Sequence, residues 1–144
     1  MNRFSLKLSA LVLGLGLSAL SFSAVASQGY YDAFGQKAGI TSIIDDFVGN
    51  VAADNRINAY FAHANIPFLK TSLVNQVCEA LGGPCKYTGP AMGPLHHSMG
   101  VTQAAFNALT EDLQLSMTKY NVPIPAQNHL IGILAPMSKD IITK

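Results

Sequence analysis

Two adjacent histidines, His96 and His97, are the residues of this chain with the clearest capacity for chemistry. They follow a loop rich in glycine and proline that begins at Gly82, and they precede Gly100-Val101-Thr102, the expected start of another helix. Imidazole is a common metal ligand in proteins. A histidine held by a short irregular segment between two core helices can therefore ligate a flat cofactor that lies between them.

Helices must position this pair, because apolar residues recur with a helical period along almost all of the chain after Ser27. Four stripes predict four helices: Ile40, Ile43, Ile44, Phe47 and Val51; Leu69, Leu73, Val77 and Leu81; Phe106, Leu109, Leu113, Met117 and Tyr120; and Leu130, Ile133, Leu134, Met137 and Ile141. Thr102 is a good N-cap for the third helix, and Pro136 predicts a kink in the fourth. A short helical turn is expected around Tyr60 and Phe61.

The connection from Gly82 to Leu95 is the feature that argues against a plain four-helix bundle. Connections in bundles usually run about two to eight residues, and irregular loops longer than about 12 are usually functional or disordered. This connection leads directly to the histidine pair, so we expect it to belong to a site.

The N-terminal residues have the pattern of a cleavable secretory signal. Arg3 and Lys7 precede an apolar run from Leu8 to Leu20, and Ala24-Val25-Ala26 resembles a peptidase site. A membrane anchor is the alternative, because the uncharged stretch is long. The peptidase-like site favours residues 1–26 as a signal peptide and residues 27–144 as one mature domain in the periplasm or outside the cell, with no membrane anchor after cleavage.

The composition excludes nucleic acid as a partner. The first 26 residues hold two of the nine basic residues and none of the eight acidic ones, so the mature chain carries a formal charge of −1. Its charges are scattered, and it lacks the basic patch that binding to a phosphate backbone requires.

Two cysteines, Cys78 and Cys85, stand at the end of the second expected helix and in the loop after it. In an exported domain they are candidates for a disulfide, which for so short a loop contributes about 2–3 kcal/mol on the chain-entropy model. Two free thiols remain the alternative, because the sequence does not fix their geometry.

A series of short motifs carries a resemblance that spans about Tyr31 to Ile142. The motifs are Tyr31-Asp32-Ala33-Phe34-Gly35, Asp46-Phe47, Tyr60-Phe61, Leu69-Lys70, Leu81-Gly82-Gly83-Pro84, Tyr87-Thr88-Gly89, Met92, and His96 with Gly100-Val101-Thr102. Together they resemble the group I truncated haemoglobins. The resemblance implies an all-α truncated globin, a two-over-two helical sandwich around one b-type haem.

The same resemblance implies that His96 is the proximal iron ligand, because the family's histidine stands four residues before the matching Gly100. Side chains of adjacent helical residues point about 100° apart, so His96 and His97 cannot easily face one iron together. His97 is then expected to face solvent or the haem edge. A c-type attachment is not expected, since no Cys-x-x-Cys-His motif occurs.

The remaining site residues follow from the resemblance as well. The residues expected to line the distal pocket are Phe47, Val48, Phe61, Leu69, Leu73 and Val77. Lys70 and Tyr87 are expected to contact the haem propionates.

Two positions depart from the family on the distal side. Val48 stands where the family commonly has Tyr, and Leu73 stands where it commonly has Gln. Such donors would hydrogen-bond to bound dioxygen. Without them, we expect oxygen to leave faster and the iron to oxidise more easily, while haem binding is unaffected.

The function that follows is an exported haem protein that reversibly binds dioxygen, carbon monoxide or nitric oxide, with a redox partner protein as a further candidate partner. A haem enzyme that consumes nitric oxide or has peroxidase-like activity is the alternative. It needs a distal acid–base group, which only His63 or Ser72 could supply. A helical interaction module without cofactor is the third reading, and the intact His96 and Phe61 disfavour it.

The signal pattern generates the first prediction. Protein recovered from the periplasm or the medium should have the intact mass of a chain that begins at Ser27, because cleavage is expected after Ala26. Retention of residues 1–26 in a membrane pellet would contradict it.

Overall fold

The computed structural model describes residues 29–144, and every regular element among them is helical. The long helices are α2 (Gln36–Ala53), α3 (Ile66–Ala80), α5 (Gln103–Lys119) and α6 (Ile124–Leu134). The short elements are η1 (Asn58–Phe61), α4 (Met92–His96), η2 (Ala135–Met137) and α7 (Ser138–Ile141), and residues 29–33 form a further helical turn. The expected all-α fold is confirmed, whereas the expected signal peptide, residues 1–26, lies outside the described residues.

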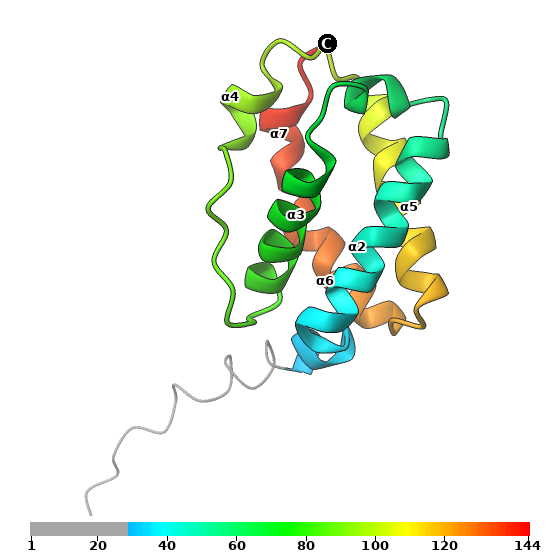
Figure 1. Cartoon of the computed structure of the whole chain (residues 1–144), viewed down its shortest axis with the longest axis vertical. Coiled ribbons are helices and arrows are strands. Elements are labelled where there is room, and N and C mark those ends of the chain that lie inside the picture. The colour runs from blue at the N-terminus through cyan, green and yellow to red at the C-terminus, as the bar shows by residue number, and fades with distance from the viewer. Residues whose placement is uncertain (1–28) are drawn as a thin grey trace, which may run out of the picture.

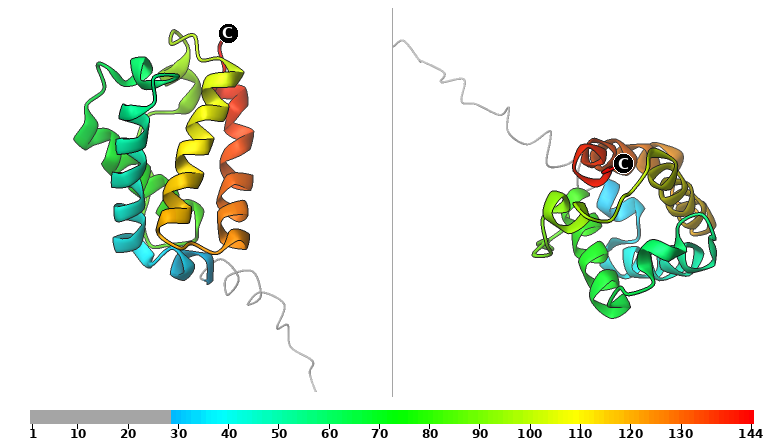
Figure 2. Two further views of the ribbon diagram at one scale, coloured as in Figure 1. Left: turned by 90° about the vertical axis from the view of Figure 1, so that its right-hand side faces the viewer. Right: turned by 90° about the horizontal axis from the view of Figure 1, so that it is seen from above.

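The long helices form two pairs around one apolar core (Figure 1). Helix α2 packs against both α3 and α5, and α6 packs against both α3 and α5. Figure 2 shows α2, α5 and the α6–α7 stretch running side by side. The short helix α4 lies to one side of the pairs and packs on α7. None of the helices within residues 29–144 is both long and apolar enough to cross a bilayer.

Helix α2 has the apolar stripe that its sequence predicts, and the stripe is buried. It starts after a tight turn in which Gly35 has a φ of 73°, a conformation that glycine adopts without steric cost. A Cβ atom at Gly39 would collide with the carbonyl oxygen of Phe34, so this turn also requires glycine one helical turn later. The helix ends at Asp54, as expected.

Helix α3 is fixed at both ends by side chains. At its start the side chain of Asn65 accepts a hydrogen bond from Phe68 N at 3.1 Å. At its end Cys78 is joined to Cys85, with the two Cα atoms 5.7 Å apart, so the pair is not a pair of free thiols. Glu79 adds two contacts to the same loop, to Lys86 Nζ at 3.0 Å and to Tyr87 N at 2.8 Å. Helix α3 and the loop that follows it are therefore held together as one unit.

The last helix begins earlier than expected. Thr102 caps α5 as predicted, since its hydroxyl accepts a hydrogen bond from Ala105 N at 3.1 Å. However, α6 starts at Ile124 rather than near Leu130, because Pro125 lies in the first helical turn, where its missing N–H costs no hydrogen bond. The expected break near Pro136 is confirmed: the turn η2 separates α6 from α7.

The expected loop from Gly82 to Leu95 is only partly irregular, because α4 occupies residues 92–96. Pro94 is accommodated there because the first turn of a helix needs no intrahelical N–H donor. His96 is thus the last residue of a short helix, not part of an irregular segment.

Polar side chains are buried where α2 and α5 meet. The hydroxyl of Ser116 donates to Asp46 Oδ2 at 2.9 Å and accepts from the amide of Asn50 at 2.9 Å, and Lys119 pairs with Asp46 at the edge. The hydrogen bond from Lys119 is the main reason that the pKa of Asp46 lies below its ordinary value. These groups satisfy one another, so their burial is tolerated.

Asp112 on α5 is the exception, because it is 4% exposed and its Oδ2 has no hydrogen-bond partner. Burial raises the pKa of this carboxyl, and the nearby charge of Asp54 raises it further. The folded protein therefore holds this proton more tightly than the unfolded chain does. The contribution of Asp112 to the free energy of unfolding therefore falls as the pH rises from about 4, the ordinary carboxyl range, towards neutral.

The substitution Asp112→Asn should raise the free energy of unfolding at pH 7, because a neutral amide replaces a buried charge. The gain should shrink as the pH is lowered through the carboxyl range, where the wild-type side chain becomes neutral too. Urea unfolding at a series of pH values measures this. Asp140→Asn, on the exposed surface of α7, is the matched control, and an equal gain in both variants would contradict the assignment.

Candidate cofactor site

His96 has one ring nitrogen engaged and one free. Its Nδ1 lies 2.8 Å from the carbonyl oxygen of Met92, one turn earlier in α4. A carbonyl oxygen can only accept, so Nδ1 carries the proton and Nε2 keeps its lone pair. A hydrogen bond from the other ring nitrogen to a carbonyl oxygen is what fixes the tautomer and the orientation of a metal-binding histidine.

A small cavity of about 60 Å³ lies beside this imidazole. Its walls come from the turn before η1, from η1, from the segment after α4, and from α5 and α7. The residues that line it are Ile57, Tyr60, Phe61, His96, Met99, Val101, Ala105, Phe106, Leu109 and Ile141. The hydroxyl of Tyr60 donates to the carbonyl oxygen of Gly100 at 3.3 Å, which leaves an almost wholly apolar wall around the histidine.

A larger cavity of about 360 Å³ opens between α2, η1 and α3. The residues that line it are Phe47, Val48, Val51, Ala52, Asn58, Ala59, Phe61, Ala62, Ile66, Leu69 and Leu73. Asn58 is the sole residue of this lining with a polar side chain, and its amide donates to Asn55 Oδ1 at 3.3 Å. The volume lies in the range of about 300–1,000 Å³ that is usual for cofactor sites.

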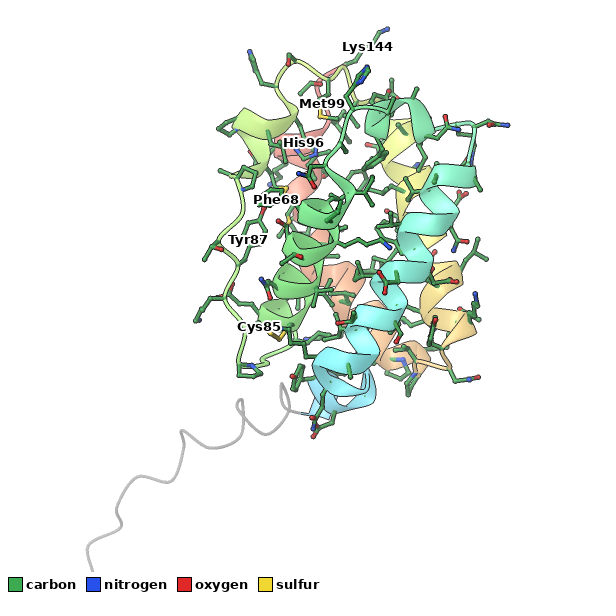
Figure 3. The ribbon with its side chains drawn as sticks, in the orientation of Figure 1. Phe68, Cys85, Tyr87, His96, Met99 and Lys144 are labelled. Atoms are coloured by element: carbon green, nitrogen blue, oxygen red, sulfur yellow. A yellow bond between two sulfur atoms is a disulfide. The ribbon has the colours of Figure 1, made fainter. Side chains whose placement is uncertain are left out.

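Phe61 lines both cavities, so they meet at this ring. Figure 3 shows His96 and Met99 on the side of α4 that faces the other helices, and Phe68 at the start of α3. Phe68 is 56% exposed, an unusual fraction for a phenylalanine. A flat apolar group with a metal at its centre fits this arrangement, since it would find one imidazole nitrogen and apolar side chains around it.

The structure brings most of the sequence-predicted residues together. The predicted residues that line the larger cavity are Phe47, Val48, Phe61, Leu69 and Leu73, and His96 lines the smaller one. Val77 is buried in the core but lines neither cavity.

The two expected propionate contacts have other partners. Lys70 Nζ lies 2.9 Å from Asp45 Oδ1 and ties α3 to α2. Tyr87 donates its hydroxyl hydrogen to the carbonyl oxygen of Pro90 at 2.7 Å, and burial raises the pKa of its phenol. Neither residue lines either of the two cavities, so the charge of Lys70 and the phenol of Tyr87 both lie away from the candidate site.

The other histidines lie away from both cavities. His97 is exposed, as expected, and His63 is exposed as well. His129 stacks on the ring of Tyr30, with centroids 3.9 Å apart and planes 14° apart. It lies within α6.

Several residues that line the cavities were not predicted from the sequence. Phe106, Leu109 and Ile141 belong to apolar stripes that were read only as core, and Tyr60 belongs to a motif that was quoted without a role. Met99 and Val101 follow His96 closely, which is a signal that could have found them. Asn58 gave no signal, because a polar residue in a short turn is ordinary.

Comparisons with known proteins agree with this geometry. The sequence model of a family described as bacterial-like globin matches residues 29–143. The chain is 30% identical over 113 residues to the group 1 truncated haemoglobin GlbN of Mycolicibacterium paratuberculosis, a match that covers 78% of this chain and 83% of that protein. It is 24% identical over 114 residues to the group 1 truncated haemoglobin of Tetrahymena thermophila, covering 79% of this chain and 94% of that one.

Two solved structures show the same fold. The truncated haemoglobin of Tetrahymena pyriformis in its Fe(III) form superposes with a TM-score of 0.76 at 23% identity, covering 80% of this chain and 98% of that one. The 2/2 haemoglobin of Synechococcus sp. PCC 7002, in the cyanomet state with covalently attached haem, gives a TM-score of 0.73 at 24% identity, with the same coverage. The expected two-over-two globin arrangement is confirmed.

The site generates a prediction that separates the adjacent histidines. His96→Ala should weaken hemin binding to the purified protein by more than about tenfold, or 1.4 kcal/mol, because it removes the imidazole that lines the smaller cavity. His97→Ala, one residue on and exposed, is the matched control and should bind hemin as the wild type does. Absorption titration measures both variants, and the reverse order would place the ligand one residue later.

Proposed function

The chain belongs to the bacterial-like globin family, and from this we propose that it is an exported haem protein that reversibly binds a diatomic gas. Its relatives are group 1 truncated haemoglobins. The observation that carries the proposal is that His96, whose Nδ1 is held by Met92, lines an apolar cavity that adjoins a second, larger one.

His96 would hold the haem b iron, and the apolar side chains of α2, η1 and α3 would pack against the rest of the group. Bound haem would supply an iron that can take dioxygen, carbon monoxide or nitric oxide. The protein contributes the fixed imidazole and the exclusion of water. Phe61 is placed to touch the cofactor, because it belongs to both cavities.

The larger cavity sets the character of the gas site. Val48 and Leu73 both line it, and neither side chain can donate a hydrogen bond. The amide of Asn58 already donates to Asn55. We therefore propose a pocket that holds apolar gases such as carbon monoxide well and gives bound dioxygen little polar stabilisation.

A haem enzyme is the alternative function, and the positions of its two candidate acid–base groups disfavour it. His63 is exposed in the turn after η1, and Ser72 is half-buried on α3; neither lines a cavity. General acid–base catalysis requires such a group within about 3 Å of the reacting atoms or one water away. Reversible binding needs none.

Export is part of the proposal. The N-terminal signal pattern motivates a signal peptide over residues 1–26, a globin domain over 27–144, and a location in the periplasm or outside the cell. The disulfide between Cys78 and Cys85 supports it, because disulfides persist in oxidising compartments and are rare in the cytosol.

Absorption spectra of the purified protein, oxidised, reduced and under carbon monoxide, test the proposal directly. A reduced protein with one histidine ligand that takes up carbon monoxide, and releases it under argon, is the expected result. Protein that cannot be loaded with hemin would overturn it.

The apolar cavity generates a further prediction. Val48→Tyr combined with Leu73→Gln should slow oxygen dissociation by roughly tenfold or more, since each neutral hydrogen bond contributes about 0.5–1.5 kcal/mol. Autoxidation should slow with it. Val48→Ile combined with Leu73→Met is the control that changes shape without adding a donor. Stopped-flow oxygen release measures the effect, and slow release already in the wild type would mean that an unrecognised donor reaches the gas.

A further inference from the structure

The last residues of the described chain are hydrogen-bonded to the segment that follows His96. The amides of Thr143 and Lys144 both donate to the carbonyl oxygen of Val101, at 2.9 and 3.1 Å. In return Val101 N donates to the hydroxyl oxygen of Thr143 at 3.1 Å. The end of the chain and the segment after α4 lie together in Figures 1 and 3.

The hydroxyl of Thr143 also reaches the residue that would bind the iron. Its oxygen accepts from Val101, so its hydrogen is left to donate, and it lies 3.5 Å from the carbonyl oxygen of His96. That carbonyl also accepts from Met99 N at 3.0 Å. One side chain thus bridges the two ends of the short stretch from His96 to Val101.

This stretch needs support from outside. Helix α4 has five residues, and a helix this short is not stable by itself in water. It packs on α7, which leads directly into Thr143. Ile141 and Val101 line the small cavity on the inner side, while Thr143 is exposed on the outer side. The contacts of Thr143 therefore lie just outside the wall that faces the imidazole.

We propose that Thr143 is a positioning residue for His96. Its hydroxyl holds the carbonyl of His96 and the amide of Val101 at a fixed separation, and this fixes where the imidazole lies in the cavity. The inference rests on the proposed function, because the position of Nε2 matters only when haem is bound. Residues 141–144 then have a role in positioning His96 in addition to their packing.

Thr143→Val tests the proposal, because valine has nearly the same shape and lacks the hydroxyl. The backbone hydrogen bonds from residues 143 and 144 to Val101 remain possible in this variant. Thr143→Ser restores the hydroxyl and should restore the wild-type behaviour. Thr41→Val is the matched control: that threonine is also exposed, and its hydroxyl donates only to Lys37 O in its own helix, at 2.8 Å.

The first readout is the iron–histidine stretching band in the resonance Raman spectrum of the reduced, hemin-loaded protein. It should shift or broaden in Thr143→Val and stay at the wild-type position in Thr143→Ser and Thr41→Val. The second is the rate at which haem passes to an excess of a competing apoprotein, which should rise by about twofold or more in Thr143→Val, because both hydrogen bonds of the hydroxyl are lost.

The possible outcomes distinguish a failure of the proposed haem-binding function from a failure of the role assigned to Thr143. A wild-type protein without an iron–histidine band would overturn the proposed function itself. A wild-type band that stays unchanged in Thr143→Val, or that shifts equally in Thr143→Ser, would overturn the role of the hydroxyl while leaving haem binding intact. The Raman spectra are recorded on folded protein that is loaded with hemin, so a general loss of stability does not produce the expected pattern of shifts.

Discussion

The proposed haem site depends on one interaction, the hydrogen bond from His96 Nδ1 to the carbonyl oxygen of Met92, because it holds the imidazole in one orientation and leaves Nε2 with its lone pair. The constraint is local to α4, but α4 is too short to hold its own place. Its position depends on the packing against α7, on the contacts of the last residues with Val101, and on the disulfide at the far end of the preceding loop. Contacts from several parts of the chain therefore fix the position of the His96 imidazole.

Helix α2 contributes both to the apolar core and to the larger cavity. One of its faces buries Ile40, Ile43 and Ile44 in the core, and further along Phe47 and Val48 line the larger cavity. Asp46 and Asn50, at the border with α5, hold Ser116 and fix how the two helices meet. A polar contact at that border orients the helix, and the apolar residues along it provide the space for a cofactor.

The long helices could be predicted from sequence because each buries an apolar stripe with a 3.6-residue period. Helix α4 could not, because five residues that include Gly93 and Pro94 show no period. The start of α6 at Ile124 was not predicted, because the apolar stripe begins only at Leu130 and Pro125 in the first turn gives no helical signal. Lys70 pairs with Asp45 across two helices, and such a pairing depends on how the helices pack. The candidate site follows from motif resemblance, and its apolar character follows from Val48 and Leu73.

The disulfide at Cys85 has a consequence for how the molecule opens. It fixes one end of the stretch that contains α4, and the contacts of Val101 fix the other. Between them lie residues 86–100, with one short helix and few buried side chains, so this stretch can unfold locally while the four long helices stay folded. Its amides should exchange with solvent through that local opening. A cofactor could then leave and return without global unfolding, and the covalent link at Cys85 limits how far the opened stretch can move.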